Sequence, residues 1–126
     1  MKTILVVEDF VAVQQFLRET LESRGYETLG ATNGDEAYEI LATHSPRINL
    51  VLTDYHMPDS SGYDLIKKIK ENQELKNIPV IFLTTETNPE IIKKVKQIGF
   101  TSWIKKPYRP EVLLNEIETA MVGYNS

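Results

Sequence analysis

The sequence has no cysteine and no long apolar segment. The absence of cysteine excludes a disulfide scaffold and any thiolate metal site, and it fits a reducing compartment. The longest apolar runs, at residues 4–7 and 80–83, are far too short to span a membrane. A net charge of −4 gives no reason to expect the concentrated basic face that a nucleic-acid backbone demands. We therefore expect a cytoplasmic protein with no membrane insertion and no direct nucleic-acid contact.

The rest of the composition is that of an ordinary globular protein. Of the 126 residues, 41% are hydrophobic and 25% are charged, without the apolar depletion that is typical of disorder. A chain of this length buries roughly two thirds of the surface that its unfolded form exposes. We therefore expect one domain over residues 1–126.

Five segments have the character of β-strands. Residues 4–7, 50–52 and 80–83 are continuous apolar runs rich in β-branched side chains, as expected of strands covered on both faces. Residues 26–31 and 101–105 are mixed in polarity, which suits strands nearer the edges of a sheet. The three apolar runs are therefore predicted to form the centre of the sheet.

After each of these segments the apolar period becomes helical. Asn33, Ser61 and Asn88 offer N-terminal caps for three helices. Pro110 begins the fifth helix, which should end near Gly123. The stripes predicted to be buried are Val13, Phe16, Leu17 and Leu21; Ala37, Ile40 and Leu41; Leu65, Ile66 and Ile69; Ile91, Ile92 and Val95; and Val112, Leu113, Leu114, Ile117 and Met121.

Strand and helix thus alternate five times, without an internal repeat or a linker. Right-handed crossovers then favour an α/β fold, in which five helices cover a doubly wound parallel sheet of five strands. The pattern alone does not fix the strand order. The flavodoxin-like order 2-1-3-4-5 is a common solution for five such units, and we adopt it here.

Functional side chains follow four of the predicted strands. Glu8 and Asp9 come after the first strand, Asp54 after the third, Thr84 after the fourth and Lys106 after the fifth. In the order 2-1-3-4-5 these strand ends meet in one crevice. Three carboxylates in one pocket repel each other unless protons or a cation neutralise them. Mg²⁺ suits such a site, because it takes oxygen ligands and keeps several waters.

A hydroxyl and an ammonium in the same pocket suit a phosphoryl group better than a metal alone, because phosphoryl transfer depends mainly on positioning and charge neutralisation. An aspartate can attack phosphorus and form an acyl phosphate. Asp54 is the best-placed nucleophile. Taken singly, each residue has a simpler interpretation, and Asp9 could merely cap the first helix. Their joint placement favours a site.

This set of residues resembles the signature of response-regulator receiver domains. The resemblance rests on ILVVED at residues 4–9, LVLTDYHMP at residues 50–58, Gly62, Thr84 and the Lys106–Pro107 pair, and it covers essentially the whole chain. It implies that Asp54 takes its phosphoryl group from a phosphohistidine of a sensor histidine kinase or a phosphotransfer protein. It also implies a stand-alone, chemotaxis-type regulator that acts on a downstream protein target.

The resemblance also implies roles for further residues. Thr84 and Lys106 would contact phosphoryl oxygens, and the peptide bond between Lys106 and Pro107 would be cis. The Mg²⁺ ligands that it implies are Glu8, Asp9, Asp54 and the backbone carbonyl of His56.

Two positions depart from the family pattern. Thr85 stands where receivers usually carry alanine or serine, and a one-residue shift would turn its side chain into the pocket in place of Thr84. We prefer Thr84 because it directly follows the apolar run. Trp103 stands where the family has a residue, often a smaller aromatic ring, whose rotation reports phosphorylation. It is interpreted either as a switch residue or as a partly buried packing residue.

Other side chains are assigned to rate and readout. His56 and Glu86 lie two residues beyond Asp54 and Thr84, so we expect them to gate the attacking water and to set the dephosphorylation rate. Lysines near Trp103 would form a basic face for an acidic partner, although lysines on a helix often serve solvation alone. The lysines assigned to this face are Lys93, Lys94, Lys96 and Lys105, with Arg109 nearby.

The expected mechanism is a population shift. A phosphoryl group carries about two negative charges and would draw Thr84 and Lys106 inward. The surface of the fourth helix, fifth strand and fifth helix would then favour a binding-competent state. The expected chemistry is limited to self-phosphorylation and self-dephosphorylation.

Several alternatives remain open. The chain could be a phosphorelay shuttle or a receiver fragment of a larger regulator. A Mg²⁺-dependent phosphohydrolase typically has a second acid two residues after its aspartyl nucleophile, where this chain has His56. A flavin-binding module needs a phosphate-binding first loop, which Glu8 and Asp9 would repel. The intact set of acids, threonine and lysine argues against a pseudo-receiver that acts purely as an interaction surface.

Overall fold

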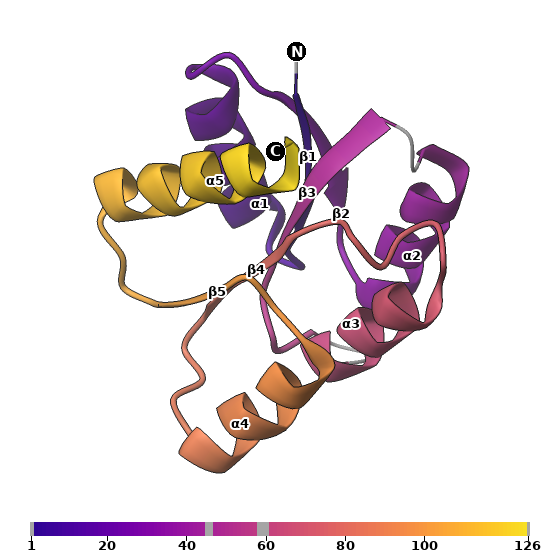
Figure 1. Ribbon diagram of the computed structural model, residues 1–126. Coiled ribbons are helices and arrows are strands. Elements are labelled where there is room, and N and C mark those ends of the chain that lie inside the picture. The colour runs from indigo at the N-terminus through magenta and orange to yellow at the C-terminus, as the bar shows by residue number, and fades with distance from the viewer. Residues whose placement is uncertain (1, 45–46, 58–60, 126) are drawn as a thin grey trace.

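The computed structural model describes residues 2–44, 47–57 and 61–125, with side chains up to residue 122. Five strands and five helices alternate along the chain, as predicted (Figure 1). The strands are β1 (Thr3–Val7), β2 (Glu27–Ala31), β3 (Ile48–Thr53), β4 (Val80–Thr84) and β5 (Ser102–Lys105). The helices are α1 (Val11–Glu22), α2 (Gly34–His44), α3 (Gly62–Glu71), α4 (Pro89–Ile98) and α5 (Pro110–Asn125).

The five strands form one parallel sheet in the order β2-β1-β3-β4-β5, which confirms the predicted flavodoxin-like order. In its register Val7 lies opposite Ala31 on one side and Thr53 on the other. Thr84 lies opposite Lys105 at the same edge. The carboxyl ends of β1, β3, β4 and β5 are therefore neighbours.

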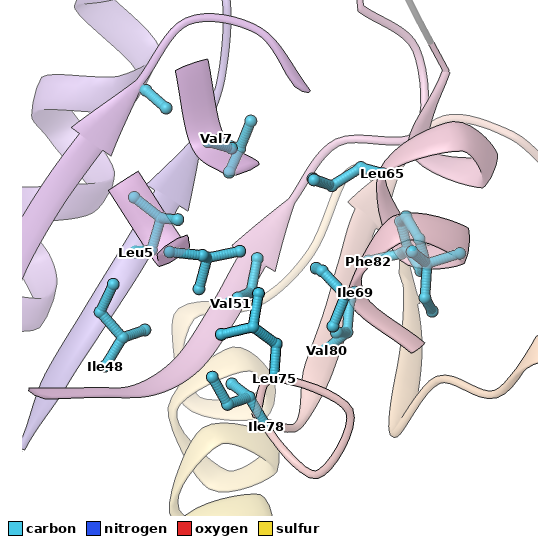
Figure 2. Close-up of a cluster of buried hydrophobic side chains, with 14 of the residues drawn as sticks. Leu5, Val7, Ile48, Val51, Leu65, Ile69, Leu75, Ile78, Val80 and Phe82 are labelled. Carbon is cyan, nitrogen blue, oxygen red and sulfur yellow. The ribbon is translucent and has the colours of Figure 1, made fainter. Parts of the chain in front are cut away.

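Helices cover both faces of this sheet (Figure 1). Buried residues of α1 and α5 form one core with one face of the strands, and those of α2, α3 and α4 form a second core with the other. Successive strand residues alternate between the two, so Leu5 belongs to one core and Ile4 to the other. Figure 2 shows the second core, where Val51 and Val80 lie with Leu65 of α3.

The predicted caps begin their helices. Ser61 and Asp64 form a reciprocal capping box at α3. The side chain of Asn88 accepts a hydrogen bond from the backbone of Glu90 at α4, and Asn33 caps α2 in the same manner. The first helix differs, because its N-cap is Phe10 and no side chain caps it. The interpretation of Asp9 as a helix cap is therefore wrong.

The predicted stripe of α1 requires a correction. Leu17 and Leu21 are buried, but Val13 is 39% exposed and Phe16 is 59% exposed. Gln14 occupies the inward position instead, because its amide donates to the backbone carbonyls of Glu8 and Ala31 at 3.1 and 2.9 Å. With Gln14 facing inward, Val13 and Phe16 lie on an apolar edge of the helix that faces outward.

The fifth helix also differs in detail from the prediction. Val112 is 46% exposed, since Leu113 and Ile117 take the inward positions of the stripe. The helix ends at Asn125 rather than near Gly123. None of the helices in the described part of the chain has the length and hydropathy that a membrane crossing requires.

Candidate functional site

A pocket of about 430 Å³ opens at the carboxyl edge of the sheet. It receives side chains from the loops after β1, β3, β4 and β5, as the strand order requires. Its lining residues are Glu8, Asp9, Phe10, Val13, Asp54, His56, Met57, Thr85 and Lys106.

One ammonium joins two carboxylates in this pocket. Lys106 Nζ lies 3.3 Å from Glu8 Oε1 and 3.3 Å from Asp54 Oδ2. The side chain of Glu8 is 4% exposed and that of Asp54 is 14% exposed, so Asp54 is the acid that solvent reaches more readily. The two acids that the sequence placed at different strand ends therefore face one cation.

Charge and burial oppose each other at these groups. Burial raises the pKa of Glu8 above its ordinary value, and a hydrogen bond with Asp9 raises it further, while the backbone N–H of Phe10 and then Lys106 oppose both effects. Burial alone would lower the pKa of Lys106, but the charges of Asp54 and Glu8 outweigh it and raise that pKa. Lys106 is therefore held in its charged form beside the two acids.

The backbone fixes Asp54 in place. Its N–H donates to the carbonyl of Val7 at 3.2 Å, which ties the end of β3 to the end of β1. The N–H of His56 donates to Asp54 Oδ1 at 3.1 Å, so each carboxylate oxygen has its own partner. Gly62 N–H donates to the carbonyl of Tyr55 at 2.6 Å. A side chain at Gly62 would collide with Phe82, and glycine therefore allows this close approach.

The two threonines after β4 occupy different environments. Thr84 is fully buried, and its hydroxyl oxygen accepts a hydrogen bond from the N–H of Glu86 at 3.1 Å. Its carbonyl accepts the N–H of Lys106 at 2.8 Å, which holds the ends of β4 and β5 together. Thr85 is exposed and lines the pocket. The predicted preference for Thr84 over Thr85 stays a prediction.

The donor set of the pocket fits a hard cation. Oxygens of Glu8 and Asp54 already converge on one positive group, and Asp9 adjoins Glu8. Within the described ranges, no group of three or more His, Cys, Asp or Glu side chains is arranged to hold a metal ion. Mg²⁺ keeps several waters and needs few protein carboxylates, so the oxygens present suit it better than a metal that requires a closed cage of side chains.

His56 lines the pocket, and Glu86 of the loop after β4 contacts it. His56 Nε2 lies 3.0 Å from Glu86 Oε1, with the histidine side chain 57% exposed and the glutamate 15%. The backbone N–H of Asn88 and, against a smaller effect of burial, His56 hold the pKa of Glu86 below its ordinary value. The sequence predicted a shared role for these two residues but not their contact.

Trp103 is a partly buried member of an aromatic cluster. Its ring centroid lies 5.0 Å from that of Phe82, 5.4 Å from Phe100 and 5.5 Å from Tyr55. Its indole N–H donates to the carbonyl of Glu86 at 3.0 Å. The packing interpretation therefore describes its present position, and a switching role stays a prediction.

The lysines of the predicted basic face are exposed, and a docking role stays a prediction. Lys93, Lys94 and Lys96 lie on α4, and Lys105 lies at the end of β5. Lys94 also lies 4.3 Å from the ring centroid of Tyr63 on α3, in a cation–π contact. The peptide bond between Lys106 and Pro107 is cis, as the resemblance implied. Pro58 of the motif lies outside the described residues.

Sequence reasoning missed the apolar side of the pocket. Phe10 is 69% exposed, and it lines the pocket together with Val13 and Met57. A period of 3.6 residues cannot reveal this arrangement, because it assigns apolar residues to the core by default. The polar Gln14, which directly follows Val13, was the available signal that the apolar edge of the helix faces outward.

Known proteins resemble this chain in sequence and in fold. The family "Response regulator receiver domain" matches residues 4–118. The chain is 34% identical over 119 residues to the chemotaxis protein CheY1 of Helicobacter pylori strain ATCC 700392 / 26695, covering 94% of this chain and 95% of that protein. The structure of Vibrio cholerae chemotaxis protein CheY4, crystallized at pH 4.0, is 32% identical with a TM-score of 0.88, covering 95% and 98% of the two chains. A receiver domain protein of Clostridium thermocellum is 27% identical with a TM-score of 0.92, covering 99% and 98%.

Proposed function

This chain belongs to the response regulator receiver domain family, and from that premise we propose that Asp54 is its phosphoryl acceptor. As a receiver it functions in two-component signalling, where such domains accept phosphoryl groups and interact with histidine kinases and downstream targets. The contact of Lys106 with both Glu8 and Asp54 carries the proposal, because it places one cation and a second acid, Glu8, beside the more solvent-accessible carboxylate of Asp54. We also infer that residues 1–126 form one receiver domain.

The transfer is a displacement at phosphorus. A carboxylate oxygen of Asp54 attacks the phosphorus of a phosphohistidine, a P–O bond forms, and the P–N bond breaks with its electron pair on the imidazole nitrogen, which takes up a proton. Lys106 stays beside the growing negative charge. Thr84 accepts a hydrogen bond from Glu86 and keeps its own hydroxyl hydrogen to donate to a phosphoryl oxygen.

Receiver domains generally bind Mg²⁺ at their phosphorylation site, and we propose the same for this chain. When bound, the ion neutralises negative charge on the transferring phosphoryl group. The residues that would hold it are Glu8, Asp9, Asp54 and the backbone carbonyl of His56.

This chain offers the phosphoryl-group donor an apolar surface for docking. Phe10 and Val13 line the pocket, and Val11 and Phe16 continue their exposed apolar edge along the start of α1. A donor protein must bring its phosphohistidine to Asp54 past this rim. We therefore propose that this edge packs against the apolar surroundings of the donor's histidine.

The readout that we propose is the surface of α4, β5 and α5. Phosphorylation draws Thr84 and Lys106 toward the new charge and shifts the population at Trp103, beside the exposed Lys93, Lys96 and Lys105. A downstream target with an acidic segment would suit these lysines. His56 and Glu86 set the lifetime of the acyl phosphate, because His56 lines the pocket through which water must reach it and Glu86 holds the His56 side chain.

The decisive test is phosphorylation by a small donor. Incubation with acetyl phosphate and Mg²⁺ should add one labile phosphoryl group to the wild-type protein, measured by intact mass. Asp54→Asn should gain none, because an amide cannot form the acyl phosphate. Asp64→Asn is the matched control, since Asp64 belongs to the capping box of α3 and does not line the pocket, and it should label as the wild type does. A wild-type protein that gains no phosphoryl group would falsify the proposal.

A further inference from the structure

Glu86 connects three parts of the molecule through hydrogen bonds. Its carboxylate contacts His56 Nε2 at 3.0 Å and accepts the N–H groups of Thr87 and Asn88 at 3.1 and 3.0 Å. Its carbonyl accepts the indole N–H of Trp103 at 3.0 Å. The side chain thus ties the loop after β3 to the loop after β4, while the backbone of the same residue holds the tryptophan.

Each of these contacts lies next to a group of the proposed chemistry. His56 is two residues beyond Asp54 and donates its own N–H to the acceptor carboxylate at 3.1 Å. The N–H of Glu86 is bonded to the hydroxyl of Thr84. The loop after Asp54 is therefore joined to Trp103 by hydrogen bonds through one intervening residue, Glu86.

We infer that Glu86 is a positioning residue that couples the acceptor loop to Trp103 through its pairing with His56. We call the contact between His56 Nε2 and Glu86 Oε1 the clasp. With the clasp closed, the carbonyl of Glu86 is held against the indole and Trp103 stays in its aromatic cluster. Opening the clasp loosens both. The lifetime of the acyl phosphate and the position of Trp103 are then not independent properties, because one pair of side chains controls both.

The number of hydrogen bonds that each substitution removes predicts how far it loosens Trp103. Without His56, the carboxylate of Glu86 still accepts two backbone N–H groups, so its loop loses one of three partners. Without the carboxylate, all three are lost. Removal of His56 should therefore loosen Trp103 less than removal of the Glu86 carboxylate does.

Trp103 is the single tryptophan of the chain, so its fluorescence reports this coupling directly. In the unphosphorylated protein, His56→Ala should increase acrylamide quenching of Trp103, although His56 makes no hydrogen bond to the indole. The expected rise in the loosened population is roughly two- to tenfold, the factor that the loss of one net hydrogen bond produces. Glu86→Ala should exceed it, and His56→Gln should restore much of the wild-type value because its amide can still donate to the carboxylate.

The matched control is the exposed ion pair between Lys68 and Asp35. Lys68→Ala breaks the contact between Lys68 and Asp35 at 3.2 Å on α3 and α2, and it should leave quenching unchanged. Equal quenching in the wild type and His56→Ala would overturn the coupling. Far-ultraviolet circular dichroism of Glu86→Ala checks that α4 is still formed, and His56→Ala carries the test if it is not.

A second measurement links the clasp to the phosphoryl group, and it rests on the proposed function. After phosphorylation with acetyl phosphate and Mg²⁺, variants of His56 and Glu86 should change the acyl phosphate lifetime and the Trp103 quenching together. A changed lifetime with unchanged quenching would also overturn the coupling. Failure of the wild type to take up phosphoryl would count against the proposed function alone, because the quenching series needs no phosphorylation.

Discussion

At the scale of single residues, the buried acid Glu8 lowers the stability of the folded protein at neutral pH. Its side chain is nearly completely buried, and burial raises its pKa above the ordinary value. The folded protein therefore binds this proton more readily than the unfolded chain does. The resulting stability is present below the unfolded-state pKa of about 4.3 and is lost as the pH rises through the higher folded-state pKa. At neutral pH the ionised carboxylate is a cost that the fold carries.

Replacing Glu8 by glutamine should consequently stabilise the protein in the absence of divalent metal. The change removes a buried negative charge, while Asp54 remains as a partner for Lys106. We expect a gain of about 0.5–2 kcal/mol, the range typical of stabilising substitutions, in urea unfolding at pH 7. The gain should shrink near pH 4, where Glu8 of the wild type binds its proton. Destabilisation at neutral pH would contradict this account of the charge balance.

At the scale of elements, α1 has two faces with different tasks. Leu17 and Leu21 pack into the core, and the amide of Gln14 donates hydrogen bonds to the backbone carbonyls of Glu8, after β1, and Ala31, at the end of β2. The opposite edge leaves Phe16 59% exposed, three residues beyond Val13, which lines the pocket. Exposed large apolar side chains grouped beside a site indicate a contact surface rather than a packing error.

The proposed docking edge makes Phe16→Glu a selective variant. Phosphotransfer from a histidine phosphotransfer protein that labels the wild type should slow by about tenfold, which corresponds to roughly 1.4 kcal/mol of lost docking. Labelling by acetyl phosphate should not change, since Phe16 does not line the pocket. Val122→Glu on α5, 64% exposed, is the control and should affect neither reaction. Equal slowing with both donors would place the defect in the pocket instead.

At the scale of the whole molecule, the site exists only in the folded chain. Glu8 and Lys106 are 98 residues apart in sequence and 3.3 Å apart in space. The order β2-β1-β3-β4-β5 brings their strand ends together with that of Asp54. A ligand that needs all three segments binds the folded state alone and therefore stabilises the entire domain.

Addition of Mg²⁺ should accordingly raise the thermal unfolding midpoint of the wild type. Mass action predicts about 2.7 kcal/mol of added stability at a concentration one hundred times the dissociation constant. Glu8→Gln should lose most of this rise, whereas Glu90→Gln, which changes an exposed residue of α4, should keep it. An equal Mg²⁺ effect in the Glu8 variant would remove Glu8 from the ligand set.

Much of this molecule follows from the sequence alone. The β-branched runs and the helical stripes predict all ten elements, because local periodicity depends on which faces are buried. The polar residues after the strands predict the charged side of the pocket, since parallel strands end at one edge. The exposed position of Phe16 did not follow, because periodicity assigns apolar side chains to the core.

The tertiary structure alone decided which of the neighbouring groups meet. Contacts between Lys106 and two acids, between His56 and Glu86, and between Glu86 and Trp103 join loops that are far apart in the chain. Pattern and spacing describe a strand or a helix, but they do not fix the distance between side chains in different loops. Sequence therefore determined the elements and the chemistry at their ends, while the packed sheet determined the pairs, because only packing brings those loops together.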